Sequence, residues 1–173
     1  DTGTAYNSFV TGEVDMIGLS GDQVEQAKAA GYTIQTYDDG SCWYFEFNTK
    51  QAGLNNPKVR KALTLGINAH DFVQHVVKNN STIAYSFTPP AISNGRFTEA
   101  VGKVMQRVED NGGEYTEVKK MLEEGLAEEN MTLADFVVAI VTDEGDTAAK
   151  NCAFFQEQWK TNLGVTATVE QMT

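Results

Sequence analysis

The amino-acid sequence predicts an α/β fold in which helices flank a mixed sheet, and its C-terminal part carries this prediction. The run Phe136–Val141 is apolar at every position and has the length of a strand that is buried on both faces. An amphipathic helical pattern over Thr147–Asn162 and a second strand-like run over Val165–Glu170 follow it. Two strands joined by one helix form a right-handed crossover in a parallel or mixed sheet, so we expect helices above and below the first strand.

Shorter elements are expected in the N-terminal part. Residues Thr4–Thr11 have a helical pattern, and Val14–Gly18 is a brief apolar run that a glycine closes. A second helical pattern ends at Gly31 and precedes a strand-like run over Tyr32–Tyr37. Together these patterns predict a compact unit of strand, helix and strand.

Alternation of side-chain type over Trp43–Asn48 predicts a further strand with two different faces. The apolar face consists of Trp43, Phe45 and Phe47. The opposite face consists of Tyr44, Glu46 and Asn48. A polar strand face with one large ring suits either a solvated sheet surface or the floor of a cleft.

Capping residues mark the helices in the middle of the chain. Asn56 stands in the N-cap position before Pro57, which suits the first helical position. Asn68 and Asp71 have the spacing of a capping box for a second helix, and a third helical pattern covers Tyr115–Glu129. The sequence therefore predicts three well-delimited helices here.

A long aperiodic stretch separates these helices, between Lys78 and Glu114. Pro89 and Pro90 each push the residue before them out of the helical region, so this part must be extended. Loops of this length in compact domains are usually functional or mobile, which makes it the first place to look for ligand contacts. A simple crossover between two layers is an equally good interpretation.

Composition limits the class of protein. Twenty-four acidic side chains against thirteen basic ones give a formal net charge of −11, which repels a phosphate backbone, so nucleic acid is not an expected partner. A length of 173 residues with 41% hydrophobic content favours one folded domain. No stretch approaches the ~20 apolar residues of a membrane span. Because the chain begins at Asp1 without methionine, we expect it to be a domain of a longer protein.

Residue patterns that carry catalysis or bind metals are missing from the sequence. His70 and His75 are five positions apart and do not share a helical face, and the two cysteines, Cys42 and Cys152, lack the paired spacing of a zinc site. The glycines around Ser20 do not have the spacing of a nucleophile elbow, and no glycine-rich phosphate loop occurs. We therefore expect no cofactor, no bound metal and no enzymatic activity. Cys152 lies on an apolar helical stripe, where a buried thiol or a bond to Cys42 are the two interpretations.

Several stretches occur in an order found in one known family. They are Ala5–Phe9, Gly12–Ile17, Tyr44–Asn48, Asn55–Leu63, Gly66–Asn68, Ala84–Pro90 and Gln158–Val165. In these residues the chain resembles the family 5 extracellular solute-binding proteins, the oligopeptide-binding and dipeptide-binding components of ABC importers. The resemblance covers most of the chain and weakens between about Phe97 and Ala134.

The resemblance implies one lobe of a two-lobe protein like the type II periplasmic binding proteins, whose lobes close on a peptide. Residues 1–173 would form a single domain, the second lobe, with part of the crossover from the first lobe near residues 1–20. The implied partners are a peptide or other small solute, the subunits of an ABC permease, and the first lobe of the same protein. The implied location is extracytoplasmic, in the periplasm or as a cell-surface lipoprotein of a Gram-positive bacterium.

The resemblance also suggests where a ligand would bind. Family members hold a peptide mainly through its backbone, in strand-like hydrogen bonds. On this basis we expect ligand contacts from Tyr44, Glu46, Asn48, Tyr85, Ser86 and Phe87. Some relatives have a disulfide near Cys42, but the one-position displacement of this cysteine would turn it to the other strand face, so that bond is not expected here.

Two other functions remain open from the sequence. The chain could be a small acidic α/β hydrolase whose reactive residues converge only in space, or a domain that binds protein partners through an exposed face. A screen of ester and peptide substrates would reveal the first, and light scattering of a stable hetero-complex would reveal the second. The ligand class is also open among oligopeptide, dipeptide, metal chelate, sugar and signalling peptide.

Overall fold

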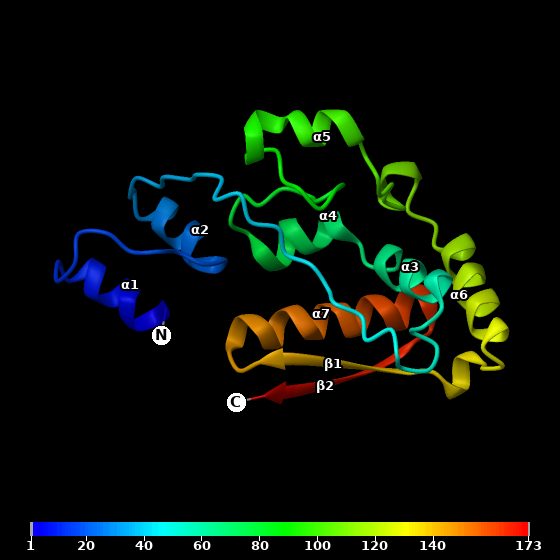
Figure 1. Cartoon of the computed structure of the whole chain (residues 1–173). Coiled ribbons are helices and arrows are strands. Elements are labelled where there is room, and N and C mark those ends of the chain that lie inside the picture. Colours follow the sequence, from blue (N-terminus) through cyan, green and yellow to red (C-terminus); the bar gives the residue numbers. More distant parts are fainter. Residues whose placement is uncertain (1, 173) are drawn as a thin grey trace.

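The structure, a computed structural model, describes residues 2–172 and contains seven α-helices and two strands in that range (Figure 1). The helices are α1 (Thr2–Val10), α2 (Asp22–Ala29), α3 (Pro57–Leu65), α4 (Ala69–Asp71), α5 (Arg96–Val101), α6 (Thr116–Glu128) and α7 (Asp146–Leu163). The strands are β1 (Val137–Asp143) and β2 (Thr166–Met172). A π-helical turn (Phe72–Val77) continues α4, and short 3₁₀ turns occur at Ile92–Gly95, Glu109–Asn111 and Leu133–Asp135.

The C-terminal unit of β1, α7 and β2 confirms the α/β class. The two strands pair in parallel, from Val137 opposite Thr166 to Asp143 opposite Met172. Helix α7 connects them and lies along one face of the sheet, as Figure 1 shows. The sequence predicts a mixed sheet, but the strands described in residues 2–172 include no antiparallel member.

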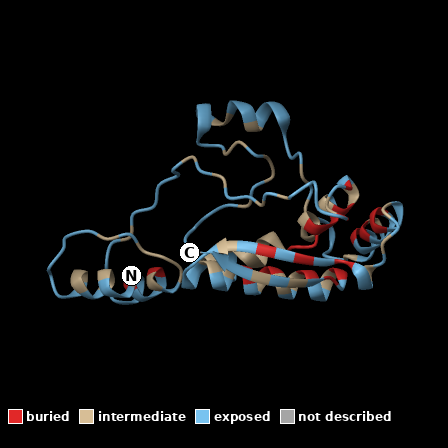
Figure 2. Ribbon diagram, turned by 60° about the horizontal axis from the view of Figure 1, so that its bottom comes forward, coloured by how far each residue is buried: buried red, intermediate tan, exposed pale blue. Residues whose placement is uncertain are grey.

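The hydrophobic core lies where α3, α6, α7 and β1 meet, and Figure 2 shows the buried residues concentrated there. Its largest fully buried side chains include Trp159, Phe155, Leu63 and Leu122. The indole N–H of Trp159 donates a 2.8 Å hydrogen bond to the backbone oxygen of Leu63. The most deeply buried polar group of α7 is thereby paired, and it ties α7 to α3.

The predicted caps are confirmed and position the helices. The Asn56 side chain accepts a 2.9 Å hydrogen bond from the N–H of Lys58, and its amide donates at 2.8 Å to Glu128 at the end of α6. The start of α3 is thus fixed to the end of α6. Asn68 similarly accepts a 2.9 Å hydrogen bond from the N–H of Asp71 and begins α4.

Three of the predicted strands are absent from residues 2–172. The segments Val14–Gly18, Tyr32–Tyr37 and Trp43–Asn48 have no strand partner in the described structure. Local alternation gives a segment a pleated face, but a strand also needs a neighbour to accept its backbone hydrogen bonds. The part containing α1 and α2 therefore forms an arm that extends away from the core (Figure 1).

The prediction that β1 is buried on both faces is also wrong for the described residues. Val138 and Ile140 are buried on the α7 side, whereas Val137 and Val141 on the other face are 53% and 56% exposed. No helix of residues 2–172 covers that second face (Figure 2). The apolar run is thus a strand with one face in the core and one apolar face open.

Candidate ligand-binding site

The extended segment Trp43–Asn48 lies on α7 through its aromatic rings. The Phe45 ring meets Phe155 edge-on with the centroids 4.8 Å apart, and the Trp43 ring stacks on the same Phe155 at 5.6 Å. The alternate residues of the segment, Tyr44, Glu46 and Asn48, are exposed. The predicted division into an apolar and a polar face is confirmed for Phe45 and Phe47, which are half-buried, but not for Trp43, which is 59% exposed. The segment is also not paired as a strand.

The structure brings the two predicted site segments together. The rings of Tyr44 and Phe87 are in contact, with centroids 5.1 Å apart and planes inclined at 59°. The two side chains remain 53% and 68% exposed. We call this pair the aromatic wall, because it presents two adjacent rings to solvent from segments that are far apart in the sequence.

A groove of about 920 Å³ runs between Trp43–Asn48 and strand β1. All residues of both segments line it, and its floor comes from Cys152, Phe155 and Trp159 of α7. The thiol of Cys152 is buried and free, and burial raises its pKa. Because the floor belongs to the core, the groove has an apolar base and backbone along both sides.

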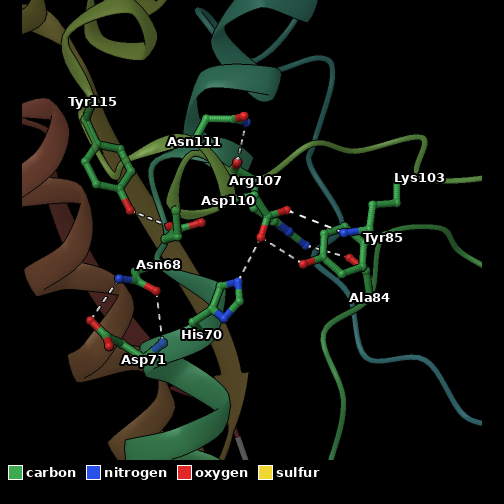
Figure 3. A network of polar contacts seen from close by, with 11 residues as sticks. Asn68, His70, Asp71, Ala84, Tyr85, Lys103, Arg107, Asp110, Asn111 and Tyr115 are labelled. Atoms are coloured by element: carbon green, nitrogen blue, oxygen red, sulfur yellow. Dashed lines mark hydrogen bonds and ion pairs between the residues drawn. The ribbon is translucent and has the colours of Figure 1, made fainter.

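Asp110 anchors the loop of residues 78–114 to α4 through His70, as Figure 3 shows. Its Oδ1 atom lies 3.0 Å from Nε2 of His70 and accepts a 3.0 Å hydrogen bond from the hydroxyl of Tyr85. An ionised carboxylate only accepts, so Nε2 of His70 carries the proton that it donates. Lys103 Nζ lies 3.9 Å from Asp110 Oδ2 and 3.9 Å from the centroid of the Tyr85 ring. Tyr85 is therefore held at its hydroxyl and on its ring face.

Buried polar groups hold the end of this loop on the helices. The Arg107 guanidinium donates to the backbone oxygens of Ala84 at 3.0 Å and Thr64 at 3.5 Å, and burial lowers its pKa. Two buried atoms, Nε of Arg107 and Oε2 of Glu109, have no hydrogen-bond partner among the described residues. The hydroxyl of Tyr115 donates to Glu109, and burial together with this bond raises the pKa of Tyr115 above its usual range.

The remaining predicted site residues have different surroundings. The Ser86 hydroxyl donates to the backbone oxygen of Thr88 at 3.1 Å, and Asn48 Oδ1 accepts from the N–H of Lys50 at 3.1 Å. Both contacts stabilise local turns. The exposed carboxylate of Glu46 forms no hydrogen bond or ion pair with any residue in the part of the chain that the structure describes.

The residues that position Tyr85 escape sequence-based reasoning. Lys103, Arg107 and Asp110 lie in the aperiodic loop, where no spacing relates one side chain to another. His70 lies in α4, and its partner Asp110 comes from the loop and not from its own helix. No signal in a single sequence pairs two residues that are 40 positions apart.

Replacing Asp110 by asparagine is expected to lower thermal stability at neutral pH and to have little effect in strong acid. The hydrogen bond from His70, with help from Tyr85 and Lys103, holds the pKa of Asp110 below the usual aspartate range. Such a group stabilises the folded state above its unfolded pKa, and the stabilisation is lost as the pH falls through the folded pKa. Unfolding midpoints of wild type and variant, measured from about pH 7 to about pH 2, should therefore converge.

The matched control is Glu123→Gln, which removes one exposed carboxylate of α6 that has no ion pair among the described residues. It changes the net charge equally and should follow the wild-type midpoint at each pH. If the difference in unfolding midpoint between wild type and Asp110→Asn stayed constant over the whole pH range, the charge of the carboxylate would not be what stabilises the loop.

Two further features of the described chain bear on its class. Residues 2–172 contain no group of three or more His, Cys, Asp and Glu side chains arranged to hold a metal ion. None of the helices in that range combines the length and the apolar character that crossing a bilayer requires.

A helix-covered parallel sheet with an aromatic wall beside an open groove defines an α/β binding module. Over residues 1–173 the chain matches the family described as bacterial extracellular solute-binding proteins, family 5 Middle, and it belongs to that family. This membership confirms the resemblance seen in the sequence. It is a family of extracellular solute-binding proteins and not of enzymes.

Named relatives agree with this assignment. The chain is 29% identical to the oligopeptide-binding protein OppA and 25% identical to the dipeptide-binding protein DppE of Bacillus subtilis, each over 175 residues. These matches include 94% and 99% of this chain but 30% and 31% of the relatives. The solved structure of Listeria monocytogenes OppA bound to peptide is 28% identical, with a TM-score of 0.82 over 99% of this chain and 34% of that one. The chain thus spans about a third of the length of the proteins it matches.

Proposed function

We propose that this chain is the second lobe of an extracytoplasmic peptide-binding protein that delivers its ligand to the permease subunits of an ABC importer. In this proposal residues 1–173 form one domain, and residues 1–20 carry part of the crossover from the first lobe. The ligand is a peptide or another small solute that the two lobes enclose. The protein works in the periplasm or as a lipoprotein at the cell surface. Family membership and relatives named for oligopeptide and dipeptide binding support this function.

The observation that carries the proposal is the aromatic wall of Tyr44 and Phe87, with its rings 5.1 Å apart and largely exposed. Contacting aromatic rings that stay open to solvent provide apolar surface that a ligand can cover. Tyr44 lies on the face of the extended segment that also presents Glu46 and Asn48. Apolar contact and polar recognition are therefore available side by side.

The polar residues of this face suit the backbone of an extended peptide. Glu46 forms no ion pair or hydrogen bond in the described chain, so its carboxylate is free to accept from a peptide N–H or ammonium group. Asn48 uses its oxygen in a local turn, which leaves its amide nitrogen available to donate to a peptide carbonyl. Recognition of N–H and C=O groups is independent of side chains and permits broad peptide specificity.

The double variant Tyr44→Ala, Tyr85→Ala in the longer protein is expected to weaken peptide binding about tenfold or more, or ~1.4 kcal/mol. Tyr44→Ala removes one ring of the wall, and Tyr85→Ala removes the contacts with Asp110 and Lys103 that hold the neighbouring part of the loop, including Phe87, in place. The probe is the peptide that mass spectrometry identifies in the purified protein, and calorimetry measures its affinity.

Tyr37→Ala is the matched control, because Tyr37 is 87% exposed and forms no ring contact among the described residues. The affinity of the Tyr37→Ala variant for the peptide should equal that of the wild type. Unchanged affinity in the double variant would remove this site assignment.

The isolated chain should show no peptide-induced shift of its melting temperature, since half of a cleft leaves most of the ligand in water.

A further inference from the structure

The arm that carries α1 and α2 is joined to the rest of the chain by a connector, residues 33–42, that has no regular structure (Figure 1). In the described chain the connector forms no hydrogen bond between main-chain groups. No residue of α1 or α2 belongs to the hydrophobic core of residues 2–172. The position of the arm on the body, residues 43–172, therefore depends on contacts that the arm itself makes.

Helix α2 meets the body at its first residue. The Asp22 carboxylate lies 2.8 Å from Nζ of Lys78 through Oδ1 and 3.8 Å from Nζ of Lys150 through Oδ2. Lys78 follows the π-helical turn Phe72–Val77, and Lys150 belongs to α7. One carboxylate of the arm thus contacts two separate elements of the body, each with its own oxygen. We call these three side chains the Asp22 clamp.

The backbone brings the two sides of the clamp together. Lys78 has φ +51° and ψ +31°, a left-handed conformation that residues with a Cβ atom rarely adopt. Such residues, like π-helical turns, occur preferentially at functional sites. On the arm side, a Cβ atom added to Gly21 would lie 3.8 Å and 4.0 Å from the backbone oxygens of Val77 and Val76. The start of α2 therefore lies directly against the end of the π-helical turn.

The helix ends make this junction electrostatically favourable. A helix carries partial positive charge at its N-terminus and partial negative charge at its C-terminus. Asp22 is the first residue of α2, and Lys78 is the C-cap of the π-helical turn, so each side chain has the sign that stabilises its own helix end. The two helix ends also meet with opposite partial charges. The ion pair therefore reinforces a contact that the backbone already favours.

An ordinary surface ion pair is the alternative interpretation. Exposed pairs often add little to stability, and the side chains of Asp22, Lys78 and Lys150 are 62%, 37% and 68% exposed. These pairs, however, join two parts of the chain that the core does not hold together. A small free energy is enough to shift the equilibrium between two positions of such an arm.

We propose that the Asp22 clamp holds the arm on the body and thereby sets the angle between the two lobes of the longer protein. The inference rests on the proposed function in one respect, because that proposal assigns residues 1–20 of the arm to the crossover from the first lobe. The apparent affinity of a ligand scales with the population of the arrangement that binds it. The clamp therefore tunes peptide affinity without belonging to the candidate ligand-binding site.

Distances between two spin labels test the clamp in the longer protein without peptide. The labels are attached to cysteines that replace the exposed residues Met16 of the arm and Lys160 of α7, with Cys42 replaced by serine. In Asp22→Asn we expect the ratio of molecules with the arm on the body to molecules with the arm released to fall about three- to tenfold. Salt at about 1 M should cause the same shift in the wild type and none in the variant, because it screens exposed charges.

Glu25→Gln is the matched control. It removes one carboxylate from the same helix, but the partner of Glu25 is Lys28, which lies 2.9 Å away and also belongs to α2. The arm should keep its wild-type distance distribution in this variant. Lys78→Gln removes the other side of the clamp and should repeat the effect of Asp22→Asn.

A wild-type distance distribution in Asp22→Asn would overturn the inference, and so would an equal shift in Glu25→Gln. Calorimetry with the co-purified peptide then tests the link to the lobes, because the affinity of Asp22→Asn should fall by the same factor as the ratio of arm positions. A shift of the arm without loss of affinity would overturn that link. A protein that binds no peptide but releases its arm in Asp22→Asn would remove the proposed function and leave the clamp standing.

Discussion

Replacing Trp159 by alanine is expected to lower the free energy of unfolding by about 3–5 kcal/mol, which is a large part of the stability of a typical domain. Trp159 is 1% exposed, and its ring packs against Phe45 with the centroids 5.7 Å apart. The substitution removes this packing and leaves a cavity between α7 and α3. It also removes the hydrogen bond to the Leu63 oxygen. Urea unfolding followed by circular dichroism measures the change.

Two further variants separate the causes of this loss. Trp159→Phe keeps most of the ring volume but cannot donate to Leu63, so it should lose only about 1–2 kcal/mol. Lys160→Ala alters the exposed neighbour on the same helix and should stay within about 0.5 kcal/mol of wild type. A loss below about 1 kcal/mol for Trp159→Ala would contradict the placement of this ring at the centre of the core.

Sequence reasoning succeeds for the fold wherever an element's own residues decide its structure. Asn56 with Pro57 and Asn68 with Asp71 are local caps, and both begin helices as predicted. The crossover of β1, α7 and β2 follows from periodicity and chain connectivity. The predicted strands at Val14–Gly18, Tyr32–Tyr37 and Trp43–Asn48 fail because pairing depends on a second segment, and alternation alone does not provide one.

The same distinction holds for the candidate site. Alternation correctly separates exposed Tyr44 from half-buried Phe45, because that separation is a property of one extended segment. The contact of Tyr44 with Phe87 joins two segments that only the resemblance to solute-binding proteins proposed together. The anchoring of Tyr85 by Asp110 has no local signal, since a loop side chain meets its partner only in the folded chain.

Gly53→Ala is expected to destabilise the chain by about 2–4 kcal/mol, the sum of a backbone cost and a collision. Gly53 has φ +80°, a left-handed conformation that disfavours any residue with a Cβ atom. An added Cβ would lie 2.7 Å from Cε2 and 2.9 Å from Cδ2 of Phe136, and 3.4 Å from Cδ2 of Leu126. Thermal or urea unfolding of the variant measures the sum of the two costs.

Gly113→Ala separates these two costs, because Gly113 has a similar φ of +78° but no atom within 4 Å of an added Cβ. Both substitutions restrict the unfolded chain equally, so the difference between the two variants isolates the contact with Phe136. We expect Gly53→Ala to be more destabilising by about 1–3 kcal/mol. Equal losses would mean that Phe136 can move aside. The turn that joins Trp43–Asn48 to α3 would then not be fixed by the core, and the aromatic wall would lose the rigid support that the proposed site requires.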